Sequence, residues 1–148
     1  MLTDGPPRQK AALAQFLESD RLGTLEVPQD DRLRGPAKAL EAAMSDQNSV
    51  GVHQASAEFL NRAADFYGVR KPAVRVLAAR PIRVREGGWA TELFGDYAPE
   101  TMLIRVWMRT AVLKQVTSYG TFLSTICHEF CHHLDYQRFG FCDSWHTL

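Results

Sequence analysis

The sequence lacks the features that would place the protein in a membrane or in a disulfide scaffold. It has no apolar run of about 18 residues, so no transmembrane helix is expected. The first 20 residues show no basic start followed by an apolar stretch, so no signal peptide is expected. There are three cysteines and no Cys-x-x-Cys pair, which argues against a disulfide framework and a cysteine-rich zinc knuckle. We therefore expect a reducing, cytoplasmic setting.

An excess of charge of one sign is also missing. The 17 basic and 17 acidic residues cancel, so no overall field attracts nucleic acid or an anionic membrane. The chain has 148 residues, 45% of them hydrophobic and 23% charged. This length and composition are typical of a globular protein, and we expect residues 1–148 to form a single domain.

Hydrophobic periodicity predicts three helices in the first half of the chain. The first is expected to be capped by Asp4 and to start near Pro6 or Pro7, the second to start at Pro36, and the third to end at Gly68. The apolar positions at helical spacing are Leu13, Phe16 and Leu17, then Ala37, Leu40, Ala43 and Met44, then Val52, Ala55, Phe59, Ala63 and Phe66.

The middle of the chain predicts a meander of about four short strands. They are expected around residues 74–76, 82–84, 89–94 and 102–109, with a turn at residues 86–88 and a break at residues 96–100. A last helix is expected over residues 119–138, capped by Thr117 or Ser118 and ended by Gly140. The sequence therefore predicts an α+β fold with N-terminal helices, a small, mostly antiparallel sheet and a C-terminal helix.

The last helix carries the motif His128-Glu129-Phe130-Cys131-His132. At about 100° per residue, His132 lies about 40° from His128, so both imidazoles can reach one metal ion. The opposite side is expected to pack in the core, and it holds Leu123, Ile126, Cys127, Phe130 and Leu134. Zinc prefers imidazole ligands, and at a catalytic site it activates a water molecule. Glu129 lies beside the two histidines, where a carboxylate can act as general base.

A catalytic zinc site needs three protein ligands. His146 is the favoured third ligand, because the chain can fold back over the helix after Gly140. Asp135 and Asp143 remain alternatives, and Cys142 is a weaker one. His133 points about 140° away from His128 and cannot share its metal. His53 lies in a predicted helix and is interpreted as a surface or capping residue.

In these features the sequence resembles the SprT-like zinc metallopeptidases, which are compact zincins. The resemblance rests on the HExxH helix, on His146 within Ser144-Trp145-His146, and on the strand at residues 102–109. It covers roughly the last 50 residues. It implies zinc bound by His128, His132 and His146, with Glu129 as general base. The Gly-Pro pair that usually follows the family's third histidine is replaced by Thr147 and Leu148.

The resemblance implies a peptidase that binds a protein or peptide substrate in extended form along an edge strand, for which residues 102–108 are the candidate. Two other functions fit the sequence less well. One is a non-catalytic zinc-binding module for protein interactions, whose zinc site would be closed by a fourth protein ligand. The other is a nucleic-acid-associated protein that uses the arginine-rich strands. The arginines concerned are Arg75, Arg80, Arg83, Arg85, Arg105 and Arg109.

Overall fold

The protein has an α+β fold. The structure, a computed structural model, describes residues 6–21, 24–84 and 90–141. Within these residues the elements, in chain order, are α1 (Lys10–Arg21), α2 (Arg34–Ser45), α3 (Ser49–Tyr67), β1 (Ala73–Ala79), β2 (Ile82–Val84), β3 (Ala90–Glu92), β4 (Gly95–Ala98), β5 (Leu103–Arg109) and α4 (Tyr119–Phe139).

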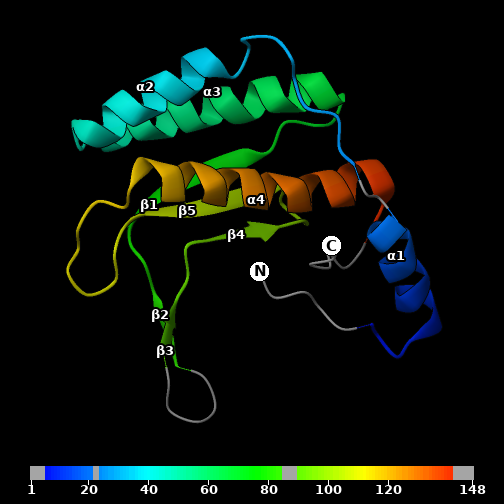
Figure 1. The fold of residues 1–148 in the computed structure, drawn as a ribbon. Helices are drawn as coiled ribbons and strands as arrows, with labels where there is room; N and C mark the ends of the chain where they lie inside the picture. The colour runs from blue at the N-terminus through cyan, green and yellow to red at the C-terminus, as the bar shows by residue number, and fades with distance from the viewer. Residues whose placement is uncertain (1–5, 22–23, 85–89, 142–148) are drawn as a thin grey trace.

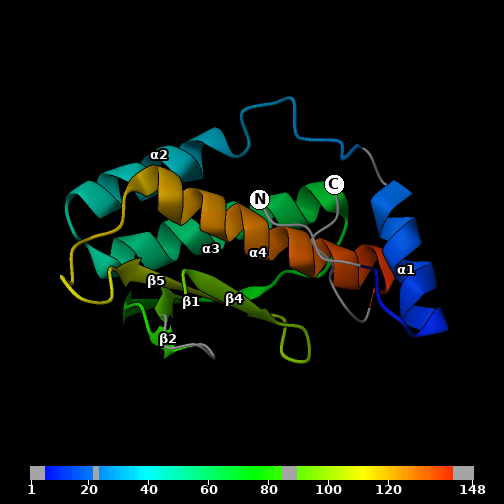
Figure 2. The same ribbon diagram turned by 60° about the horizontal axis from the view of Figure 1, so that its bottom comes forward.

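A three-stranded sheet with the order β1-β5-β4 supports the helices. α3 packs on β1, while α4 packs on β4 and β5. Both helices lie on the same side of the sheet, and α2 lies against α3 and also contacts α4 (Figure 2). The β2–β3 hairpin forms a separate two-stranded ribbon that projects away from the helices (Figure 1).

The predicted meander is wrong, because the sheet is mixed. β1 pairs in parallel with β5, with Val74 opposite Ile104. β4 pairs antiparallel with β5, with Tyr97 opposite Ile104. The segment predicted as a break thus contains β4, whose Gly and Asp are poor strand formers on their own. Pairing with β5 decides its conformation, and a pattern within one strand cannot reveal its partner. The predicted turn at residues 86–88 lies outside the described residues.

One hydrophobic core joins the sheet to α2, α3 and α4. Ile104, Val106 and Met108 alternate along β5 toward the helices, and each is at most 4% exposed. They belong to the same cluster as Leu60 of α3 and Ile126 of α4. Burial of these side chains holds α4 against the sheet, since each large apolar side chain contributes about 1.5–3 kcal/mol when removed from water.

The predicted ends of α3 at Gly68 and of α4 at Ser118 and Gly140 are confirmed, whereas the cap at the start of α3, Asn48, was not predicted. Asn48 caps α3 by accepting the Gly51 N–H, and Gly68 ends it with φ 64°. Ser118 caps α4 by accepting the Thr121 N–H, and Gly140 ends it with φ 66°. A positive φ is readily adopted by glycine, which has no Cβ. α2 begins at Arg34, so Pro36 lies in its first turn.

The first helix starts later than predicted. α1 begins at Lys10, after Pro6 and Pro7, and the predicted cap Asp4 lies outside the described residues. No residue of α1 belongs to the hydrophobic core formed by the described residues. In both ribbon views α1 lies beside the C-terminal end of α4 (Figures 1 and 2). Among the described residues, no helix combines the length and apolar character needed to cross a membrane.

Candidate metal centre and adjoining pocket

α4 presents a core face that differs from the predicted one. Its buried residues are Phe122, Ile126, Glu129, Phe130, His133 and Leu134. Cys127 is exposed, so its predicted place in the core is wrong. Compared with the predicted core face, the buried face of α4 is rotated toward Glu129, because the polar side chains of Glu129 and His133 face inward. A hydrophobic pattern does not count such residues as core.

His128 and His132 converge as the motif predicts. Their Nε2 atoms lie 3.1 Å apart, and the ring planes make an angle of 88°. Two nitrogens at Zn–N distances of about 2.0–2.1 Å in a tetrahedral site are about 3.3 Å apart. The two imidazoles therefore fit a shared tetrahedral metal ion with little movement.

The described residues do not contain the rest of a ligand set. Among them, no group of three His, Cys, Asp or Glu side chains is arranged to hold a metal ion. His146, the favoured third ligand, lies outside the described residues, as do the alternatives Asp143 and Cys142. Asp135 lies on α4, half-buried, but does not complete such a group with the two histidines.

Glu129 lies at the interface between α4 and β4. Its side chain is only 7% exposed, and Gly95 on β4 passes so close that a Cβ there would lie 3.4 Å from the Glu129 Cγ. Burial, with a smaller contribution from the negative charge of Asp96, raises the pKa of Glu129 to about 7. A carboxylate with this pKa can both accept and release a proton near neutral pH.

A chain of buried hydrogen bonds fixes β4 against α4. His133 is fully buried, with its Nε2 2.6 Å from the Arg70 carbonyl oxygen and its Nδ1 2.8 Å from the Tyr97 hydroxyl. The carbonyl can only accept, so Nε2 carries the proton and the Tyr97 hydroxyl donates to Nδ1. Burial lowers the pKa of His133, which favours this neutral form. His133 is therefore a structural residue that sets the position of β4 beside Glu129.

A pocket of about 430 Å³ opens beside Glu129. Residues from the segment that joins β3 to β4 form one wall, and the first half of α4 forms the other. Its lining residues are Leu93, Phe94, Gly95, Ser124, Thr125, His128 and Glu129. The sequence analysis identified His128 and Glu129. It missed the opposite wall, because the segment from Leu93 to Tyr97 carries no motif.

The strand proposed as a substrate-binding edge is not an edge. β5, at Leu103–Arg109, lies between β1 and β4. The alternation of apolar and polar residues along β5 indicates which face of the strand is buried. It does not indicate whether the strand pairs with one neighbouring strand or with two. Within the described part of the chain, β4 is the edge strand of the sheet on this side, and it is also the strand that packs on α4 beside the pocket.

Most of the strand arginines whose side chains the structure describes are engaged in contacts within the protein. Arg80 is buried and donates to the Thr117 hydroxyl, while Arg105 forms an ion pair with Asp96. Arg109 donates to the Lys114 carbonyl and to the Gln47 side chain. Arg75 is exposed. The side chains of Arg83 and Arg85 lie outside the described residues. This arrangement gives no support to a nucleic-acid interface on the strands.

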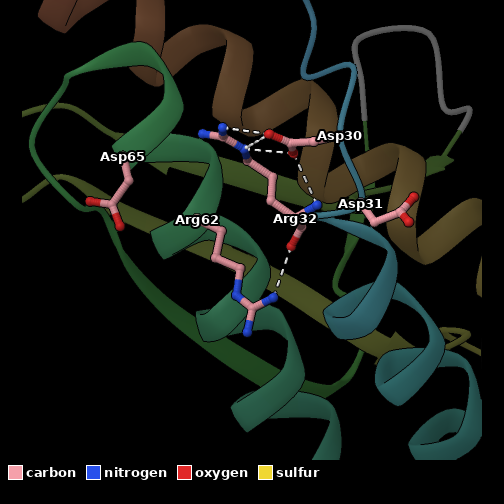
Figure 3. A pocket seen from close by; sticks show the side chains of 5 residues that line it. All are labelled: Asp30, Asp31, Arg32, Arg62 and Asp65. Carbon is pink, nitrogen blue, oxygen red and sulfur yellow. Dashed lines mark hydrogen bonds and ion pairs between the residues drawn. The ribbon is translucent and has the colours of Figure 1, made fainter.

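A second hollow, of about 320 Å³, lies between the segment before α2 and α3 (Figure 3). Its charged groups are engaged with one another: Arg32 binds Asp30, and Arg62 donates to the Arg32 carbonyl oxygen. Asp65 forms an ion pair with Lys71. The Arg62 hydrogen bond joins the segment before α2 to α3. These contacts are exposed, so each contributes little to stability.

Comparisons with known proteins identify no relative of this chain. No protein-family model matches the sequence, and neither curated proteins nor solved structures gave a match. Its function must therefore be argued from the site itself.

Proposed function

We propose that this chain is a zinc-dependent peptidase of the SprT-like type, a compact zincin in which His128, His132 and His146 bind the metal. The observation that carries the proposal is the convergence of the two Nε2 atoms, 3.1 Å apart, next to a buried glutamate whose pKa is about 7. Metal ligands and a general base thus occupy adjacent positions on one helix, with a pocket beside them.

Zinc, when bound, supplies a Lewis acid that polarises the peptide carbonyl and makes a water molecule more acidic. Glu129 then acts as general base: it accepts a proton from the attacking water and passes it to the departing amine. Its position beside His128 and on the wall of the pocket suits both steps, because the same carboxyl must gain a proton from the water and then lose it to the amine. His133 and Tyr97 take no part in proton transfer and hold β4 in place.

The substrate is proposed to bind as an extended strand along β4. An edge strand offers unpaired backbone N–H and C=O groups to an incoming chain, and the hydrogen bonds require no particular side chain. β4 packs on α4 and leads directly from the pocket at Gly95. A peptide added to β4 would therefore run past Glu129.

The alternative, a zinc-binding interaction module without activity, has less support. A structural zinc site is closed by four protein ligands and needs neither a general base nor an adjoining pocket. The chain provides both, at Glu129 and in the space lined by Leu93, Phe94 and Thr125. The pocket and the buried carboxylate beside the two histidines favour a catalytic role.

The test is zinc content and casein cleavage, measured on wild type, His146→Ala and Glu129→Gln, with His53→Ala as the matched control. We expect one zinc per wild-type chain, loss of zinc with His146→Ala, and retained zinc without cleavage in Glu129→Gln. His53 is exposed and bound to the Val74 carbonyl, so its removal should leave both readouts intact.

The other outcomes are equally informative. Zinc retained in His146→Ala would move the third ligand to Asp135 or Asp143. Zinc bound by wild type without any cleavage would favour the interaction module. Absence of zinc from wild type after loading would remove the peptidase proposal.

A further inference from the structure

The pocket beside Glu129 is lined by chemically different groups. His128 and Glu129 are the proposed reactive groups, and Ser124 and Thr125 lie about one helical turn before them on α4. Leu93 and Phe94, from the segment between β3 and β4, supply apolar side chains, and we call the part of the pocket lined by them with Ser124 and Thr125 the apolar end. A ligand that fills the pocket therefore contacts the apolar end and the proposed reactive groups together.

The hydroxyl groups at the apolar end are already used within α4. The Ser124 hydroxyl donates to the Thr121 carbonyl oxygen at 3.0 Å, and the Thr125 hydroxyl donates to the same oxygen at 2.8 Å. A hydroxyl group has a single proton to donate. Neither hydroxyl has a proton left to donate to a ligand, although each oxygen can still accept a hydrogen bond. The apolar surface at this end comes from Leu93 and Phe94, and it suits an apolar group.

Phe94 is exposed, yet both its ring and its backbone contact the rest of the protein. Its side chain is 44% exposed and is not part of the hydrophobic core. Its ring lies over the guanidinium of Arg80, with 3.9 Å between the Arg80 Cζ and the ring centroid. Arg80 is itself buried and donates to the Thr117 hydroxyl at 2.7 Å. The Phe94 carbonyl accepts the Trp107 N–H, so backbone and ring both have partners.

An aromatic side chain that lines a pocket and already packs on a neighbouring group can bind an apolar group with less loss of conformational entropy than one without such a contact. We propose that Phe94, with Leu93, selects peptides that carry a bulky apolar side chain, such as Leu or Phe, immediately beside the cleaved bond. The side chain enters the apolar end of the pocket and brings its peptide bond to Glu129 and His128. This inference rests on the proposed peptidase function, and it adds the class of substrate.

The experiment compares blocked peptides that are identical except for one central residue, which is Leu, Phe, Ala or Asp. Cleavage is measured as kcat/KM for zinc-loaded wild type, Phe94→Ala, Ser124→Leu and the control Leu113→Ala. Leu113 is 71% exposed and does not line the pocket. Binding of the same peptides to Glu129→Gln, with and without Phe94→Ala, is measured by fluorescence anisotropy and does not depend on cleavage.

We expect wild type to prefer the Leu and Phe peptides over the Ala and Asp peptides by about tenfold or more, the usual effect of filling an apolar pocket. Phe94→Ala should remove most of this preference. Ser124→Leu should narrow the pocket and shift the preference toward the Ala peptide, which keeps the test decisive if Phe94→Ala fails to fold. Leu113→Ala should behave as wild type.

Equal cleavage of all four peptides by wild type would overturn the inference and leave the peptidase proposal standing. A preference that survives both Phe94→Ala and Ser124→Leu would also overturn it. If no peptide is cleaved, the anisotropy decides. A preference for Leu and Phe that disappears with Phe94→Ala would uphold the apolar subsite while the peptidase proposal fails. Equal binding of all four peptides would overturn the subsite as well.

Discussion

Burial of Glu129 has an energetic consequence that can be measured without any activity. In the unfolded chain its carboxyl has a pKa near 4.5, whereas in the folded, metal-free protein the pKa is about 7. Between these values the folded state binds more protons than the unfolded state. The stabilising effect of the protonated carboxyl is therefore present below about pH 4.5 and is lost as the pH rises through 7.

We predict that Glu129→Gln stabilises the metal-free protein relative to wild type, and that the difference grows with pH. From pH 5 to pH 8 it should increase by roughly 2–3 kcal/mol, because a change of one pKa unit corresponds to about 1.4 kcal/mol. The measurement is urea unfolding in the presence of a chelator at both pH values. Glu41→Gln, at an exposed glutamate, is the control, for which we expect no such trend. A difference between Glu129→Gln and wild type that stays constant with pH would contradict the assigned pKa.

The sequence predicted which residues of α4 meet, but not how deeply they are buried. His128 and His132 come together because their spacing matches one helical turn, which is a local property. The burial of Glu129 depends on β4, which lies more than 30 residues earlier in the chain. The prediction that Cys127 lies in the core was wrong for the same reason: the buried polar residues Glu129 and His133 rotate the buried face of α4 away from it.

At the scale of elements, the contact between β4 and α4 positions the site. Gly95 allows it: a Cβ at this position would lie 2.7 Å from the Thr125 Cγ2 and 3.0 Å from the Arg105 carbonyl oxygen. The backbone of β4 and helix α4 are therefore closer together than a residue with a Cβ atom at position 95 would permit. The helices could be predicted from their caps and periodicity, whereas β4 could not, because its pairing partner and the helix that covers it decide its conformation.

We predict that Gly95→Ala destabilises the protein by about 1–3 kcal/mol, the usual cost of overpacking. Adding Thr125→Ser, which removes the Cγ2 methyl group and keeps the hydroxyl, should recover part of this loss. Thermal or urea unfolding gives both values. Gly120→Ala is the matched control, since a Cβ there has no neighbour within 4 Å and alanine favours a helix. A Gly95→Ala protein as stable as wild type would show that β4 can move away from α4 at little cost.

At the scale of the whole molecule, the pairing of β1 with β5 organises the fold. β5 is hydrogen-bonded to strands on both sides, and its inward residues Ile104 and Val106 are at most 1% exposed. α1 contributes nothing to the core formed by the described residues. The order of the strands could not be predicted, because a parallel pair links segments far apart in the sequence and no local pattern specifies it.

We predict that amide hydrogen exchange is slowest in β5 and fastest among the helices in α1. Protection depends on local opening, which is rare where a strand is paired on both sides and covered by a core. The Ile104 and Val106 amides should exchange only through global unfolding, and those of α1 at least about 100-fold faster. Exchange followed by NMR or mass spectrometry provides the measurement. Equal protection of α1 and β5 would mean that α1 is an integral part of the cooperative unit.

The parallel pairing of β1 with β5 also fixes the order of events as the chain is synthesised. When β1 leaves the ribosome, its partner strand β5 has not yet emerged, so α2 and α3 can associate before the sheet exists. β5 must emerge before the sheet can close, and α4 follows it directly. The residues proposed to cleave peptides are thus translated last among the described elements. The pocket beside Glu129 therefore cannot form on a nascent chain before the strands and helices that support it have emerged.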